Sequence, residues 1–203
     1  MKVVHGDLLK LAMNGEFDVI VHGCNCFCQM GAGIARSIRH KFPQAYIEDI
    51  QTIKGDKSKL GTYTVSVVSV KRRRNKRTSP PASGSGFGIR RVGGGGGRGG
   101  ESGSDDRADN DEDEDNDDDS HRHSFFIVNA YTQYHWKTGP GIINADYDAI
   151  RQVFSLIATD FQGRRIGYPK IGSGLAGGDW KIISKIIDNE LHGEDHTLVE
   201  FSK

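Results

Sequence analysis

Two glycine-rich loops hold the residues of this 203-residue chain whose types and spacing are best suited to chemistry. The first carries His22, Asn25, Gly31 and Gly33, and the second, residues 172–178, reads GSGLAGG. A histidine can move a proton near neutral pH, and an asparagine amide can bond two vicinal hydroxyls. Glycines let backbone N–H groups approach a phosphate closely. The loops therefore predict a site for a ligand with several phosphates, or with a diphosphate flanked by sugars.

Each loop lies between a predicted strand and a predicted helix. The β-branched run 19–21 indicates a buried strand, and Ile34, Ile38 and Phe42 recur on one face of a helix that Pro43 ends. Residues 165–169 and 180–191 repeat this strand and helix around the second loop. Such a layout aims N–H groups and a helix N-terminus at an anion. The alternative is that the glycines only allow tight bends.

The remaining pattern predicts an α/β fold. Strands and helices alternate, which indicates a mainly parallel mixed sheet covered by helices on both faces, with ligands bound beyond the carboxyl ends of the strands. We expect Asp7 to cap a short helix after the first strand. The further predicted elements are strands at 3–5, at Tyr63, Val65 and Val67, at 125–130 and at 197–201, and a long helix from Ile143 to Phe161.

The middle of the chain differs in composition from the rest. The basic run Lys71 to Arg77 precedes five consecutive glycines and residues 101–119, which hold twelve acidic residues and one arginine. Residues 72–123 have too few apolar side chains to offset the entropy of ordering, so we predict a disordered insertion between two strands. This insertion interrupts a single domain that spans residues 1–203.

The basic run has two functional interpretations, a nuclear localisation signal or a nucleic-acid patch. The acidic tract could neutralise it, and Phe87 is the only aromatic residue of the insertion that could stack on a base. Nucleic acid is therefore not expected as a partner. The sequence has neither the pattern of a signal peptide nor the apolar length of a membrane span, so we expect an intracellular protein, cytoplasmic or nuclear, without a membrane partner.

Three cysteines, Cys24, Cys26 and Cys28, lie within five positions. They are too close together to brace a fold by disulfides, so we expect free, buried thiols. Their alternation with His22 could suit a metal ion, but zinc sites usually use Cys-x2-Cys spacing. We expect no metal and no cofactor.

The two loops and the early pair Gly6-Asp7 resemble the motifs of the macro domain, the ADP-ribose-binding module. In that family a Gly-Asp pair, an asparagine loop running into a Gly-x-Gly helix start, and a late Gly-Ser-Gly-like loop surround one ADP-ribose. The resemblance covers residues 1–70 and 125–203 and implies a three-layer α/β/α fold. It implies ADP-ribose or ADP-ribose 1''-phosphate as ligand, and leaves ADP-ribosylated proteins open as partners. The implied ligand-binding residues are Asp7, Leu8, Asn25, Gly31, Ala32, Gly33, Ile34, Gly172, Ser173, Gly174, Leu175, Ala176 and Gly177.

The resemblance also bears on the reaction. Where many macro domains have another asparagine, this chain has His22, as in the yeast and phage branch that removes phosphate from ADP-ribose 1''-phosphate. We therefore predict a phosphatase in which His22 and Asp179 handle protons while Asn25 holds the distal ribose. His22 could equally bond a backbone carbonyl, and Asp179 could cap the helix that follows it.

Two other functions would use the same pocket. One is a binding module that recognises ADP-ribose without chemistry, and the other is a hydrolase that removes ADP-ribose from proteins. A branch that cleaves ADP-ribose from glutamate uses a lysine and an aspartate, where this chain has Thr132, Gln133 and Ala176. Its mechanism is therefore doubtful here. Tyr131 and Gln133 could instead line the distal end of the pocket.

Overall fold

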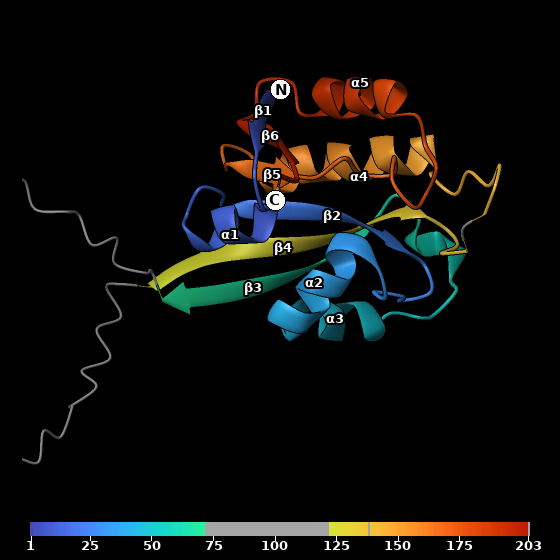
Figure 1. The fold of residues 1–203 in the computed structure, drawn as a ribbon, viewed down its shortest axis with the longest axis horizontal. Coiled ribbons are helices and arrows are strands. Elements are labelled where there is room, and N and C mark those ends of the chain that lie inside the picture. The colour runs from blue at the N-terminus through green and yellow to red at the C-terminus, as the bar shows by residue number, and fades with distance from the viewer. Residues whose placement is uncertain (72–121, 138, 203) are drawn as a thin grey trace, which may run out of the picture. The chain divides into compact units, whose positions relative to one another are not determined.

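The computed structural model describes residues 1–71, 122–137 and 139–202, which form a six-stranded mixed sheet between two layers of helices (Figure 1). The strand order is β1-β6-β5-β2-β4-β3. All neighbouring strands are parallel except β3 and β4, which are antiparallel. The strands are β1 (Lys2–His5), β2 (Val19–Asn25), β3 (Tyr63–Lys71), β4 (Arg122–Gln133), β5 (Ile166–Tyr168) and β6 (His196–Glu200). The predicted α/β class and mixed sheet are confirmed.

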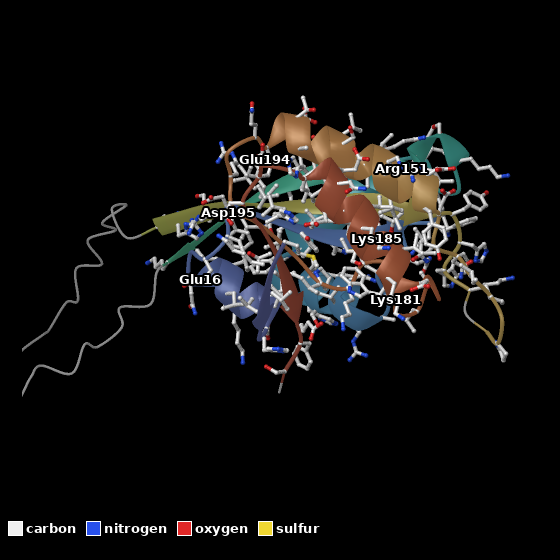
Figure 2. The ribbon with its side chains drawn as sticks, turned by 90° about the horizontal axis from the view of Figure 1, so that it is seen from above. Glu16, Arg151, Lys181, Lys185, Glu194 and Asp195 are labelled. Carbon is white, nitrogen blue, oxygen red and sulfur yellow. The ribbon has the colours of Figure 1, made fainter. Side chains whose placement is uncertain are left out.

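Helices cover both faces of the sheet. Apolar side chains of α4 and α5 form one core cluster with the sheet, and those of α1, α2 and α3 form another on the opposite face. Figure 2 shows α4 and α5 from above, with Arg151, Lys181 and Lys185 on their solvent side. The helices are α1 (Leu8–Met13), α2 (Gly33–Lys41), α3 (Pro43–Ile50), the short 3-10 helix η1 (Lys57–Lys59), α4 (Tyr147–Asp160) and α5 (Trp180–Glu190).

The apolar run of β2 is explained by its position inside the sheet. Val19 and Val21 pack in the cluster of α4 and α5, whereas Ile20 packs in the cluster of α1, α2 and α3. Side chains of a strand alternate between faces, so a strand buried on both sides needs apolar residues at successive positions. The strand predicted at 19–21 is therefore a central strand.

The antiparallel strands β3 and β4 lie directly before and directly after residues 72–121 in the sequence. Lys71 is opposite Arg122, and Val70 is opposite His123. Arg122 and His123 were predicted to belong to the insertion, and this is wrong, because cross-strand pairing extends β4 to Arg122. The insertion is thus a connection between two neighbouring strands, as predicted. The predicted disorder concerns residues 72–121, which lie outside the described residues. These residues include the rest of the basic run and the acidic tract.

Three local predictions differ from the structure. Pro43 does not only end a helix but begins α3, because proline suits the first helical turn. The half-buried strand predicted from Tyr63, Val65 and Val67 is β3, but Val65 and Val67 are 37% and 58% exposed, and its buried residues are Ser66 and Val68. Ile143 is 64% exposed and precedes α4. Within the described residues, no helix has the length and apolar character that crossing a membrane requires.

Candidate ligand-binding cleft

A cleft of about 1080 Å³ opens at the carboxyl ends of the strands. All of the predicted ligand-binding residues except Ser173 and Gly177 line it. The wall consists of Gly6, Asp7, Leu8 and Leu9 after β1; Gly23, Asn25, Gln29, Gly31, Ala32, Gly33, Ile34, Ala35 and Ser37 from β2 into α2; Gln133 and Trp136 from β4; Pro169, Lys170, Gly172, Gly174, Leu175 and Ala176 after β5; and Val199, Glu200 and Phe201 from β6.

The N-terminus of α2 forms part of this wall and has no side-chain cap. Its N-cap residue is Ala32, and no side chain accepts a hydrogen bond from the first turn. The N–H groups of residues 33–35 have no acceptor among the described residues. The first N–H groups of any helix lack intrahelical partners and carry the positive end of the helix dipole. The start of α2 can therefore hold an anion.

The second glycine loop also lines the cleft, through Gly172, Gly174, Leu175 and Ala176. Gly172 and Gly177 have φ values of +72° and +70°, which glycine adopts without strain. The N–H of Gly178 donates to the carbonyl of Gly172 at 2.8 Å and closes the loop. Within the described part of the chain, the N–H groups of residues 172–176 donate to no protein acceptor. This loop is a second place where an anion can be bound.

Asp7 both caps α1 and lines the cleft. Its Oδ1 accepts the N–H groups of Leu9 and Lys10 at 2.9 and 3.2 Å, which confirms the predicted cap. Both bonds use one carboxylate oxygen, so Oδ2 is left to accept a donor from a ligand. The cap and the predicted ligand contact are thus compatible.

Asn25 is 7% exposed and is held by its own turn. Its Oδ1 accepts from the N–H groups of Phe27 and Gln29 at 3.0 and 3.3 Å, and its Nδ2 donates to the carbonyl of Gln29 at 2.9 Å. One amide N–H is left. Asn25 can therefore offer a donor to a sugar hydroxyl, while its oxygen is already used to shape the loop.

His22 does not line the cleft. It is completely buried, and its Nε2 lies 2.7 Å from Oδ1 of Asn129. Asn129 uses its amide N–H groups on Ala45 and Thr64, so its oxygen is the acceptor and His22 Nε2 is the donor. Burial lowers the His22 pKa from 6.5 to about 4, and the hydrogen bonds with Asn129 and with the backbone of Gly23 act in the opposite direction. A neutral, enclosed imidazole cannot reach a ligand, so the geometry does not favour the expected proton transfer.

Asp179, Ser173 and Gly177 also lie outside the cleft wall. Asp179 is the N-cap of α5, where its Oδ1 accepts the N–H of Lys181 at 2.8 Å. The hydroxyl of Ser173 donates to the carbonyl of Lys170 at 3.1 Å. Asp179 thus has the capping role that was the alternative to proton transfer, and Ser173 bonds within its own loop. The structure does not bring Asp179 together with Asn25 in one site.

The cleft contains a charged pair that we did not predict. Lys170 Nζ and Glu200 Oε1 are 2.8 Å apart, and this hydrogen bond is the main cause of the lowered pKa of Glu200. Phe201 lies beside them in the wall and is 73% exposed. Glu200 ends β6, Phe201 follows it directly, and Lys170 lies two residues after the end of β5. Their position at carboxyl strand ends was the available signal, since ligands in such sheets bind there.

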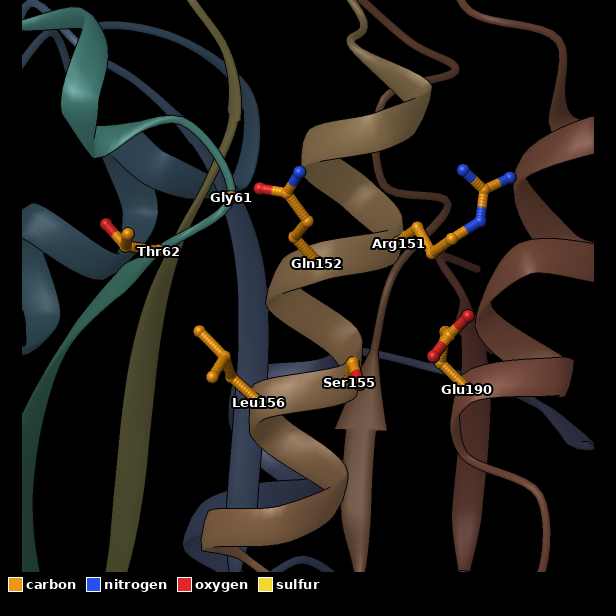
Figure 3. Close-up of a pocket in the computed structure, with 7 residues that line it drawn as sticks. All are labelled: Gly61, Thr62, Arg151, Gln152, Ser155, Leu156 and Glu190. Carbon is orange, nitrogen blue, oxygen red and sulfur yellow. The ribbon is translucent and has the colours of Figure 1, made fainter.

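The three cysteines are buried and free, as predicted. The described residues contain no group of three or more histidines, cysteines or carboxylates arranged to hold a metal ion. Figure 3 shows a second, shallower pocket of about 540 Å³, where Gly61 and Thr62 face Gln152 and Leu156 of α4, with Glu190 of α5 at the far side. It shares no residue with the cleft and none with the predicted motifs.

Comparison with known proteins agrees with this architecture. No family model matches the chain. A phage T4 protein, described as an uncharacterized 17.5 kDa protein in the tk-vs intergenic region, is 27% identical over 194 residues, which cover 93% of this chain and 88% of that protein. A Bacteroides thetaiotaomicron protein of unknown function has a similar structure, with a TM-score of 0.60 and 18% identity over 98% of both chains.

Two further solved structures are similar to this chain, and the first of them is named a macrodomain. The macrodomain of Mycobacterium tuberculosis DarG has a TM-score of 0.54 and 14% identity, covering all of this chain and 97% of that one. Thermosipho africanus DarTG, solved in complex with ADP-ribose, has a TM-score of 0.54 and 14% identity, covering all of this chain and 42% of that one. The protein described here has the macrodomain fold.

Proposed function

We propose that the protein binds ADP-ribose in the cleft. The observation that carries this proposal is the pair of loops, residues 31–35 and 172–176, whose N–H groups have no acceptor among the described residues and which face one cavity. A diphosphate bound between them would satisfy these donors. The fold supports the same ligand, since a protein of this fold was solved with ADP-ribose.

The order of the strands orients the ligand in this proposal. Asp7 follows β1 and Phe201 follows β6, at one end of the row β1-β6-β5-β2-β4. The adenine would lie there, with its amine donating to Asp7 and its ring against Phe201. The diphosphate would lie between the loops after β5 and β2. The distal ribose would then reach Asn25 and Gln133.

Removal of the 1''-phosphate from ADP-ribose 1''-phosphate is our second candidate. Its support is that two loops, each with several free N–H groups, offer more donors than one diphosphate needs. The surplus donors would stabilise charge on a phosphoryl group that a water molecule attacks. Asn25 would position the distal ribose that carries the leaving oxygen. His22 and Asp179 have no direct part in this version of the reaction.

Calorimetric titration tests the binding proposal. The wild type should bind ADP-ribose and bind adenosine much more weakly, because adenosine lacks the diphosphate. Gly174→Glu should weaken ADP-ribose binding at least about tenfold, since like charges about 5 Å apart near a surface repel by a few kcal/mol. A Cβ added at Gly174 has no atom within 4 Å, so the variant should fold.

Ser155→Glu is the matched control, because it adds the same charge at the second pocket and should leave ADP-ribose affinity unchanged. A wild type that gives no heat with ADP-ribose would refute the proposal. Release of inorganic phosphate from ADP-ribose 1''-phosphate tests the reaction separately. We expect release by the wild type and by His22→Asn. Tight ADP-ribose binding without release would leave a binding module or a hydrolase of protein-linked ADP-ribose.

A further inference from the structure

A buried polar cluster beneath the first glycine loop has no part in the proposed function. Lys59, at the end of η1, is 6% exposed. Its Nζ donates to the carbonyl of Cys26 at 3.2 Å and to Thr52 Oγ1, and lies 3.9 Å from Asp49 Oδ1. It also contacts Cys28 Sγ at 3.3 Å. A buried ammonium normally takes a carboxylate at hydrogen-bond distance, so its direct contact with a sulfur atom is notable.

The sulfur of Cys28 is held in a fixed position toward Lys59. Its thiol donates to the carbonyl of Asp49 at 3.2 Å. Cys28 has a φ of +56°, and no other non-glycine among the described residues has a positive φ. Such a conformation is uncommon for a residue with a side chain and persists only where the surroundings impose it. The backbone thus brings this thiol to the amine.

We propose that Cys28 and Lys59 form a reversible oxidative cross-link, a sulfenamide between Sγ and Nζ. Hydrogen peroxide first transfers one oxygen atom to the thiol, which gives a sulfenic acid and one water molecule. The Lys59 nitrogen then attacks the sulfur, so that an S–N bond forms as the S–O bond breaks. Of the two protons lost by the ammonium nitrogen, one leaves with the hydroxide as water and the other passes to solvent.

Reversal of the link needs a low-molecular-weight thiol as reductant. Its sulfur attacks Cys28 Sγ, the S–N bond breaks, and the amine of Lys59 is released with a proton. A second thiol then frees Cys28 from the mixed disulfide. The linked state would tie the end of η1 to the turn that Asn25 holds through Phe27 and Gln29.

The other two cysteines are less suited to this chemistry. Lys59 Nζ contacts the backbone carbonyl of Cys26, not its sulfur, and no contact joins it to Cys24. Burial raises the pKa of the Cys24 thiol, and raises that of Cys26 to about 11, so both hold little of the reactive thiolate at neutral pH. Selectivity for Cys28 therefore follows from contact geometry together with these environments.

Peptide mapping after treatment of the full-length protein with hydrogen peroxide tests the proposal. Free thiols are alkylated before digestion with trypsin. We expect residues 11–36 linked to residues 58–71, with trypsin unable to cut after Lys59 and a mass two hydrogen atoms below the sum of the two peptides. Dithiothreitol should separate them.

Variants test whether the link joins Cys28 Sγ to Lys59 Nζ. Cys28→Ser and Lys59→Arg should abolish the link, whereas Cys24→Ser should retain it. The wild-type map decides the question even where a variant fails to fold. A disulfide within residues 11–36, or a sulfinic acid at Cys28 with Lys59 still cleavable, would overturn the proposal. A linked pair that keeps one oxygen atom would overturn the condensation step.

Discussion

The two strand–loop–helix units of this fold look alike in sequence but differ at the N-cap, the residue that precedes the helix. In the first unit Ala32 is the N-cap of α2 and leaves its N–H groups without a side-chain acceptor. In the second unit Asp179 caps α5 and lies outside the cleft wall. Only the first unit directs a helix N-terminus at the cleft, and the second contributes its loop. A capping carboxylate thus distinguishes a helix start that is already satisfied from one that can bind an anion.

The strands of the two units differ as well. β2 carries His22 and β5 carries Tyr168, and both side chains are completely buried. The Tyr168 hydroxyl lies 2.7 Å from Nδ1 of His196, and burial raises its pKa. Tyr168 therefore stays neutral at any pH the protein meets. His22 is the group of this pair that responds to acid.

The largest expected effect is the pH dependence that His22 gives to the first unit. Its pKa falls from 6.5 to about 4 on folding, so between these values the unfolded state binds a proton that the folded state does not. The free energy of unfolding should therefore be unaffected above pH 6.5 and should fall by up to about 3 kcal/mol toward pH 4.

Urea denaturation of the wild type and of His22→Asn across this range would measure the difference. The variant should show a flatter slope between pH 6.5 and 4, with the remaining slope due partly to His196, whose pKa burial also lowers. His40→Asn, an exposed position on α2, is the control and should keep the wild-type slope. Equal slopes in wild type and His22→Asn would contradict the buried, neutral histidine.

The next prediction concerns two variants that exchange the N-cap residues of α2 and α5. Ala32→Asp should stabilise the protein by about 1 kcal/mol, because the new carboxylate caps α2. It should also weaken ADP-ribose binding about 10- to 100-fold, because hydrogen bonds to a charged group are worth about 1.5–3 kcal/mol and the new side chain competes for them.

Asp179→Ala is the reciprocal change. It should destabilise the protein by about 1 kcal/mol through the lost cap of α5 while ADP-ribose affinity stays as in the wild type. Calorimetry and chemical denaturation measure both quantities in each variant. If Ala32→Asp binds ADP-ribose as tightly as the wild type, the start of α2 is not the anion site.

The smallest expected effect is a difference in stability between variants of the two glycine loops. Gly172→Ala should destabilise the protein by about 1 kcal/mol, because φ is +72° and the new Cβ would lie 3.0 Å from Ile183 Cδ1. Gly31→Ala should change stability by less than about 0.5 kcal/mol, since no atom lies within 4 Å of its added Cβ. Thermal melts of both variants would check this. A larger loss for Gly31→Ala would show that the first loop is the more constrained one.

Much of the fold could be predicted from periodicity, and the errors have physical causes. The apolar repeats of α2, α4 and α5 correctly gave core-facing helices. The alternation of residues in β3 indicates a strand with two different faces, but it does not show which face packs against the core. Tyr63, Val65 and Val67 lie on one face, and Ser66 and Val68 lie on the other. α3 was missed because Pro43 suits both the end of one helix and the start of the next.

The site could be predicted where local chemistry decides it. Asp7 and both loops were found because caps and glycine turns are local. Lys170 and Glu200 were missed because their meeting depends on β5 and β6 being neighbours in the sheet. His22 was assigned to the site, but it is buried against Asn129 of β4, and this contact depends on β2 and β4 being neighbours in the sheet.

The pairing of Lys71 with Arg122 has a consequence for how this chain could have acquired its length. Opposed residues of an antiparallel pair lie about 5 Å apart, a gap that a two-residue hairpin can close. The pairing of β3 with β4 is continuous from Tyr63 and Ala130 up to that junction. For protein engineering, the connection between β3 and β4 is therefore a position at which sequence can be inserted or deleted without changing the order or pairing of the strands. It lies at the opposite end of β4 from Gln133, which lines the cleft.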